Sequence, residues 1–266
     1  MQSASPVRVE PISAVRDVVV ANSTRGCGVT TTNQLWCWGW NGSALEAPSA
    51  LEPISISGAW ASKLAASAGH LCVMGAFSLT GQVFCWGTNL AGQLGDSTTM
   101  NRTVPVRAGE IADAVAVSTS SSATCALRET GEVSCWGAGQ ALGVGRTDAE
   151  AEPSPQVVVG LTDAIELDGA SFGATTCAIR GPERRVACWG WDIAALAETG
   201  DVSSSLAPLP VDVPGLRGVA DLAVGGFHAC AVLEDGSVSC WGDNDYGQLG
   251  DGTMENRAEP TPVALP

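Results

Sequence analysis

Several residue types that common functions require are scarce in this sequence. Only 13 of its 266 residues are Lys or Arg, against 28 Asp or Glu, which gives a net charge of −15, and Lys63 is the single lysine. A surface this acidic repels phosphate backbones and anionic headgroups, so nucleic acid is an unfavourable partner. Because no apolar run reaches about 18 residues, we expect no membrane insertion.

Residues and motifs that are typical of enzymes are equally scarce. The chain has two histidines and one tyrosine. It contains no nucleophile-elbow, phosphate-loop or zinc-protease motif and no dinucleotide fingerprint. We therefore expect no enzymatic activity and no cofactor. A hydrolase or lyase that uses carboxylates in a central channel remains as an alternative.

The sequence does contain an internal repeat. Cys-Trp-Gly occurs five times, at intervals of 48, 50, 53 and 52 residues. Each copy follows another cysteine by 10 to 13 residues, and a leucine comes seven to nine residues after its own cysteine. The five leucines are Leu45, Leu94, Leu142, Leu196 and Leu249. Self-similarity at such a period indicates a repeat architecture.

Each repeat reads as four short strands, the last of them flanked by proline, as suits an outer edge. The pattern predicts an all-β fold, a β-propeller with five four-stranded blades in a single domain, 1–266. The predicted repeats are 13–56, 57–109, 110–160, 161–213 and 214–266. Residues 6–12 are left as a spare outer strand. We expect that strand to close the ring by joining the last blade; the alternative is that the chain is part of a larger ring.

The two cysteines of a repeat flank a tight hairpin. A left-handed turn residue is expected four positions before the second cysteine, where Asn33, Gly81, Gly131 and Gly236 stand in four repeats. Arg184 stands there in the fourth repeat, so a different turn is expected. Directly opposed residues lie within disulfide range. The predicted disulfides are Cys27–Cys37, Cys72–Cys85, Cys125–Cys135, Cys177–Cys188 and Cys230–Cys240.

Free buried thiols and a metal site are the alternatives to disulfides, although zinc sites favour shorter cysteine spacings. Disulfides imply an oxidising compartment. We therefore expect an extracellular, cell-surface or periplasmic protein. Met1–Pro6 shows neither the basic nor the apolar segment of a signal peptide, so a signal peptide would lie outside this sequence.

The repeated Cys-Trp-Gly, with Gly247-Gln248-Leu249-Gly250 in its clearest copy, resembles the repeat of the regulator of chromosome condensation (RCC1) family. The cysteine pair is similar to that of secreted bacterial members. The resemblance implies a propeller whose turns bind partners, and family rings usually have seven blades. The family's chromatin and GTPase role conflicts with the negative charge and the cysteine pattern.

Binding residues are expected in the loops of one propeller face, above all in the turn before each first cysteine. The candidates are Arg25, His70, Phe172, Phe227, His228, Trp40 and Trp191. The two histidines hold equivalent positions, either as a ligand or acid–base pair or as repeat residues that hydrogen-bond neighbouring backbone. Another protein is the expected partner, and a glycan bound by the tryptophans is the alternative.

The Cys-Trp-Gly tryptophans are expected to pack in the core. Trp36, Trp40, Trp60 and Trp191 are not explained by the repeat, and they are interpreted as extra packing or as a contact surface. Asp243, Asn244, Asp245 and Asp251 resemble a calcium loop but do not follow the EF-hand order. Turn formation explains them equally well, so no metal site is predicted.

Overall fold

The computed structural model describes residue 12 and residues 14–22, 25–39, 52–53, 61–191 and 206–264, with backbone alone at 21–22, 25, 39, 52–53 and 191. Five four-stranded antiparallel sheets make up the fold, which confirms the predicted all-β propeller. The strands follow one another in sequence order across each sheet. No helix in these ranges is long and apolar enough to span a membrane.

The five sheets are called blades 1 to 5. Blade 1 contains β1 (Val15–Asn22), β2 (Arg25–Thr30), β3 (Leu35–Gly39) and β4 (Glu52–Pro53). Blade 2 contains β5 (Ala61–Ala66), β6 (His70–Gly75), β7 (Val83–Gly87) and β8 (Arg102–Arg107), with the 3₁₀ turn η1 (Phe77–Leu79). Blade 3 contains β9 (Ala114–Thr119), β10 (Ala123–Arg128), β11 (Val133–Ala138) and β12 (Ala151–Val157), with η2 (Gly139–Ala141).

Blade 4 contains β13 (Ala164–Gly169), β14 (Thr175–Arg180), β15 (Arg185–Trp191) and β16 (Leu206–Asp212). Blade 5 contains β17 (Val219–Val224), β18 (His228–Leu233), β19 (Val238–Gly242) and β20 (Arg257–Pro262). Each sheet lies inside one of the five repeats read from the sequence.

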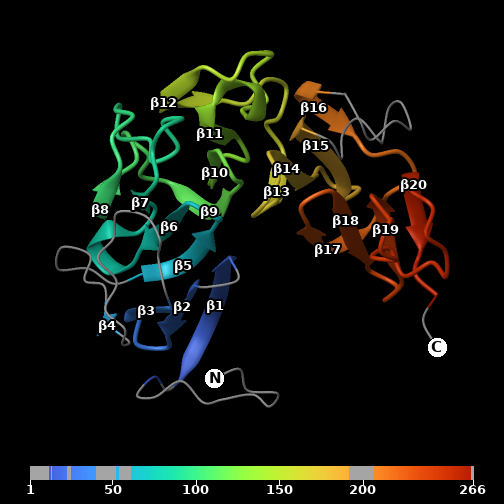
Figure 1. Cartoon of the computed structure of the whole chain (residues 1–266), viewed down its shortest axis with the longest axis horizontal. Helices are drawn as coiled ribbons and strands as arrows, with labels where there is room; N and C mark the ends of the chain where they lie inside the picture. The colour runs from blue at the N-terminus through green and yellow to red at the C-terminus, as the bar shows by residue number, and fades with distance from the viewer. Residues whose placement is uncertain are drawn as a thin grey trace.

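The blades form an open arc (Figure 1), with the first strand of each on the inside. Blades 1 and 5 lie at opposite ends of the opening, so the expected closed ring is wrong. The four strands of blade 5 all come from residues 219–262. Apart from Ile12, the spare strand 6–12 lies outside the described residues.

The disulfide prediction is confirmed. Each cysteine pair occupies directly opposed positions of the second and third strands, with the Cα atoms 4.1 Å apart. The four predicted left-handed turn residues have φ between 65° and 84°. The hairpin of the fourth repeat differs as expected, because its loop has four residues, 181–184, and Gly181 is left-handed, with φ 66°. Arg184 is left-handed as well, with φ 48°, which the sequence did not predict. Its guanidinium donates to the carbonyls of Val219 and Ala220 in the next blade, which supports this conformation.

The two faces of each blade differ in a regular way. One face carries the disulfide and contacts the following blade; the other carries the tryptophan and packs on the preceding blade. Four buried clusters, one at each junction, combine the disulfide cysteines of one blade with the tryptophan of the next. We call the disulfide side the front face and the tryptophan side the back face.

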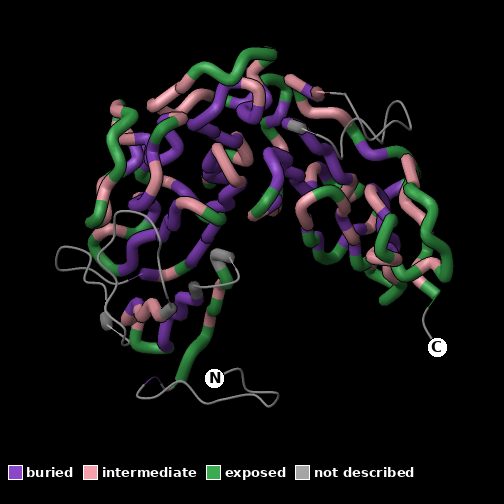
Figure 2. Tube along the Cα trace, viewed as in Figure 1, coloured by how far each residue is buried: buried purple, intermediate pink, exposed green. Residues whose placement is uncertain are grey.

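Four of the repeated tryptophans are at most 1% exposed, as core packing predicts. They are Trp86, Trp136, Trp189 and Trp241. Trp38 departs, because blade 1 has no blade before it in the arc and the side chain is half-buried. Its ring lies on its own strand pair, where a Cβ at Gly26 would be 2.7 Å from it. Figure 2 shows the buried residues concentrated where blades stack.

Candidate functional site

The turns between the first and second strands meet on one side of the arc. The amide of Ala68 in blade 2 donates to the carbonyl of Ser171 in blade 4 at 3.3 Å. The amide of Ser121 in blade 3 donates to the carbonyl of Gly173 at 2.8 Å. The curvature therefore brings the turns of three blades into direct contact, and backbone hydrogen bonds hold them in place.

Two of the predicted binding residues stand on this surface. Phe172 is 63% exposed and Phe227 is 46% exposed. Their turns touch, because a Cβ at Gly173 would collide with the carbonyl of Gly226. We call the turns 67–69, 120–122, 171–173 and 225–227 the turn patch. It presents two apolar rings on a floor of Gly, Ala and Ser.

The loops between the third and fourth strands leave the same edge of each blade, because the third strand runs parallel to the first. In blade 2, buried Asn89 organises this loop: its amide group donates to Asp96 and to the carbonyls of Thr98 and Met100, and its carbonyl accepts from the backbone N–H of Leu94. Burial alone would raise the pKa of Asp96, but hydrogen bonds from Thr98 and Arg102 outweigh it and lower the pKa.

The corresponding loop of blade 5 repeats this network around Asn244. Hydrogen bonds from Thr253, with further help from Arg257, hold the pKa of Asp251 well below its usual range. The Asp251 carboxylate is thus engaged by this chain's own groups, and Asp243 accepts the backbone N–H of Asp245. No three metal-ligating side chains gather in the ranges that the structure describes. The residues of the suspected calcium loop are organising a turn.

Exposed apolar residues on these loops were missed by the sequence reasoning. Leu90 is 75% exposed and Tyr246 is 89% exposed. Each closely follows the organising asparagine of its loop, and that recurring asparagine is the signal that could have revealed them. Their loops leave the same edge of the blades as the turns of the turn patch.

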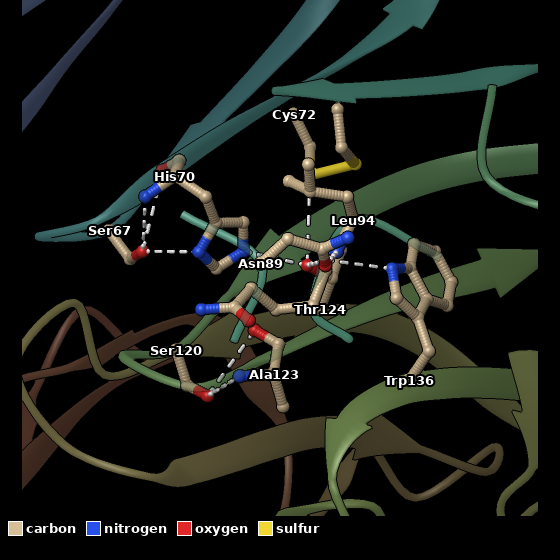
Figure 3. Close-up of a disulfide and its surroundings, with 11 residues drawn as sticks. Ser67, His70, Cys72, Asn89, Leu94, Ser120, Ala123, Thr124 and Trp136 are labelled. Atoms are coloured by element: carbon tan, nitrogen blue, oxygen red, sulfur yellow. Dashed lines mark hydrogen bonds between the residues drawn. A yellow bond between two sulfur atoms is a disulfide. The ribbon is translucent and has the colours of Figure 1, made fainter. Parts of the chain in front are cut away.

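His70 does not belong to that surface, which corrects its place among the binding candidates. It is fully buried at the junction of blades 2 and 3 (Figure 3). Ser67 Oγ lies 2.8 Å from Nδ1, and Thr124 Oγ1 lies 2.7 Å from Nε2. Its partners are thus hydroxyl groups, one of them in the next blade, where the sequence suggested neighbouring backbone.

The hydrogen-bond network assigns the tautomer of this imidazole. Thr124 donates its hydroxyl proton to the carbonyl of Gln93 at 2.8 Å, and Trp136 Nε1 donates to the same carbonyl at 2.9 Å. Nε2 of His70 therefore donates to Thr124, while Nδ1 accepts from Ser67. Burial lowers the pKa of His70 to about 3, so the ring is neutral and serves to join two blades.

His228 has the same place in blade 5, opposite Gly242 as His70 is opposite Gly87. It is only half-buried, and its ring rests on Gly225. The two histidines are therefore not a pair, since they belong to blades at different places in the arc. The other candidates are less defined: Arg25 and Trp191 lie at strand ends described by backbone alone, and Trp40 and Trp60 lie outside the described residues.

Carboxylates do gather on the inner strands of blades 4 and 5. Burial raises the pKa of Asp168 to about 6, against hydrogen bonds from the backbone of Val224 and Gly169. Burial and then the charge of Asp221 raise the pKa of Glu166. Asp168 Oδ2 accepts the N–H of Val224 in the next blade at 2.6 Å. This carboxylate therefore joins two blades.

Comparisons with known proteins agree with the repeat. Two models of the regulator of chromosome condensation (RCC1) repeat match, one at residues 114–141 and 219–248 and the other at 80–127 and 235–266. RUG3, a mitochondrial RCC1 domain-containing protein of Arabidopsis thaliana, is 30% identical over 69% of this chain and 43% of its own length. Human HERC2, an E3 ubiquitin-protein ligase, is 33% identical over 71% of this chain and 4% of its own. The chain spans less than half the length of these relatives.

Solved structures show the same fold. Human WBSCR16 superposes with a TM-score of 0.80 and 20% identity, over 95% of this chain and 67% of that one. Yeast RCC1 (Prp20), crystallised bound to Kap60, superposes with a TM-score of 0.75 and 16% identity, over 91% and 59%. With its repeats, its sheets and these matches in agreement, the chain is a member of the RCC1 repeat family.

Proposed function

We propose that this chain is a non-enzymatic scaffold that binds another protein through the turn patch. The observation that carries the proposal is the pair of exposed phenylalanines, Phe172 and Phe227, on two turns that touch. Backbone hydrogen bonds from blades 2 and 3 hold the turn of Phe172, and bonds within blade 5 hold the turn of Phe227. Rigid aromatic side chains on a preorganised surface lose little entropy on binding and are frequent hot spots. The complex of yeast RCC1 with Kap60 supports a protein partner by analogy.

The proposed location is outside the cytosol, in the manner of secreted bacterial members of the family. The support is five disulfides, which persist in oxidising compartments. Thiol titration of the denatured protein, isolated from its source under alkylating conditions, should detect almost no free thiol. Ten reactive thiols would contradict the location.

Phe172 and Phe227 can be tested together, with Phe77 as a matched control. Phe77 is 65% exposed but lies in η1, in the hairpin at the opposite edge of blade 2. We expect Phe172→Ala with Phe227→Ala to weaken capture of a partner from source extract by about 10-fold or more. Phe77→Ala should leave capture unchanged. Equal capture by all three proteins would refute the proposal.

Glycan binding is the second candidate function. Four repeated tryptophans are buried, so a lectin would have to rely on other aromatic residues, such as Tyr246. A glycan array probed with the unmodified protein and with Tyr246→Ala separates the two functions. Glycan binding that depends on Tyr246 would favour the lectin over the protein scaffold.

A further inference from the structure

The side chain of Asp168 links the two strands that lead into the aromatic turns of the turn patch. Asp168 lies near the end of β13, four residues before Phe172. Its Oδ2 accepts the N–H of Val224 at 2.6 Å. Val224 is the last residue of β17 and precedes Phe227 by three residues. This hydrogen bond therefore connects the approach to one aromatic turn with the approach to the other.

Each of the two turns is closed by its own backbone, so a shift of the strand before it moves the ring that it carries. In blade 4, the N–H of Gly173 donates to the carbonyl of Ala170 at 3.1 Å. In blade 5, the N–H of Gly225 donates to the carbonyl of His228 at 2.8 Å. The turns also touch, at Gly173 and Gly226. The relative position of the two rings therefore depends on how β13 and β17 are held together.

The repeat does not require a carboxylate at the position of Asp168, which is the first-strand residue opposite the first cysteine of its blade. The residues at this position in the other blades are Val19, Ala65, Ser118 and Ala223. Burial raises the pKa of Asp168 to about 6, so its ionisation at neutral pH has a cost to the folded state. A charge that the other blades lack, and that does not favour folding, indicates a role at the neighbouring surface.

We propose that Asp168 positions the turn patch: its ionised carboxylate holds the strand before Phe227 against blade 4, and the spacing of Phe172 and Phe227 therefore responds to pH. A charged acceptor binds an amide more strongly than a neutral one, and the bond from Val224 favours the ionised form of Asp168. Protonation in mild acid weakens the bond and loosens the two turns. The inference rests on the proposed function, in which these rings bind the partner protein, and it gives that site a dependence on pH.

The other charged or titratable groups around Asp168, among the described residues, lie on four elements. Glu166 is on the same strand and Asp221 is on β17; the charge of Asp221 adds to the effect of burial on the pKa of Asp168. His228 begins β18. β9 carries no charged side chain. The arginines at the far ends of β10 and β14 are paired, Arg128 with Asp113 and Arg180 with Asp163. Because histidine commonly titrates near pH 6 to 7, a test must separate His228 from Asp168.

Fluorine NMR tests the proposal without a partner. The chain has four phenylalanines, so incorporation of 4-fluorophenylalanine labels Phe172 and Phe227 together with two internal controls, Phe77 and Phe84. Phe77 is exposed at the opposite edge of blade 2, and Phe84 packs in the cluster between blades 1 and 2. We expect the signals of Phe172 and Phe227 to shift together, with a midpoint near pH 6. The two control signals should stay fixed.

Two variants assign the shift to its titrating group. Asp168→Asn keeps an acceptor for Val224 but has no charge, so it should abolish the shift of both patch signals. His228→Gln should leave the shift intact. Circular dichroism should confirm that both variants fold.

Three results would overturn the proposal: patch signals that do not shift together in the wild type, a shift that persists in Asp168→Asn, or a shift that is lost in His228→Gln. None of them bears on partner capture by Phe172 and Phe227. Conversely, capture that does not depend on these rings would refute the proposed function and leave the titration unchanged.

Discussion

His70 and His228 occupy the same position of the repeat and have different surroundings. His70 lies beneath blade 3, fully buried and hydrogen-bonded to Ser67 and Thr124. His228 lies at the open end of the arc and is half-buried. The following blade, more than the repeat itself, therefore decides what a repeat residue does. Junction residues and end residues should therefore respond differently to the same change.

The largest contrast is expected for tryptophan. Trp136→Ala should lower the free energy of unfolding by roughly 3–5 kcal/mol, because it empties a buried site and removes the hydrogen bond to Gln93. Trp38→Ala should cost about 1–2 kcal/mol, since that side chain is only partly buried. Urea unfolding followed by circular dichroism measures both. Equal losses would contradict the difference between junction and end.

The next largest difference in the free energy of unfolding is expected between variants of the two histidines. His70→Ala should cost about 2–3 kcal/mol at pH 7, because it leaves buried hydroxyl groups of Ser67 and Thr124 with fewer partners. His228→Ala should cost about 0.5 kcal/mol or less. Urea unfolding at pH 7 compares them.

The cost of His70→Ala should also depend on pH. The folded pKa of His70, about 3, is below its ordinary value of 6.5. The stability that this group contributes is therefore complete above pH 6.5 and is lost as the pH falls from 6.5 toward 3. The difference between wild type and His70→Ala should shrink over that interval. A difference that is constant with pH would show that folding leaves the pKa of His70 unchanged.

A smaller pH dependence of stability, with the opposite sign, is expected at the junction of blades 4 and 5. The folded pKa of Asp168, about 6, lies above its ordinary value of 3.8, so wild-type stability is lost as the pH rises from 3.8 through 6. Asp168→Asn keeps an acceptor for Val224 and should raise the free energy of unfolding by about 1 kcal/mol at pH 7, with little change at pH 4. Glu110→Gln, whose side chain is 98% exposed, is the control. Destabilisation by Asp168→Asn at pH 7 would contradict the raised pKa of Asp168.

The disulfides of the end blades and those of blades 2 to 4 should differ in their rate of reduction. Cys37 and Cys230, in the two end blades, are half-buried, whereas the cysteines of blades 2 to 4 are at most 1% exposed. Reduction requires access of a thiolate to the sulfur. The disulfides of blades 1 and 5 should therefore be reduced first, and their cysteines should be the first to be alkylated. Peptide mapping after brief reduction gives the order. Simultaneous reduction of all five would mean that the arc opens as one unit.

Much of the fold could be predicted from the residues, because it rests on local chemistry. The positions of Asn33 and Gly81 in their hairpins predicted the left-handed turns, and with them the opposed cysteines. The same reasoning predicted a different turn in the fourth repeat but not the left-handed conformation of Arg184, which a hydrogen bond to the next blade supports. The turns before the first cysteines lie at one edge of the blades, as their place between the first and second strands implies, but the contact between blades 2 and 4 was not foreseen.

Local sequence was enough to predict the strands, most of the turns, the five disulfide pairs and the repeat family, since each depends on residues a few positions apart. Tertiary structure alone decided that the arc is open, that Trp38 is half-buried while Trp136 is enclosed, and that His70 joins two blades while His228 faces an open end. The physical reason is that burial and hydrogen bonding between blades depend on the angle at which they stack. No single repeat encodes that angle.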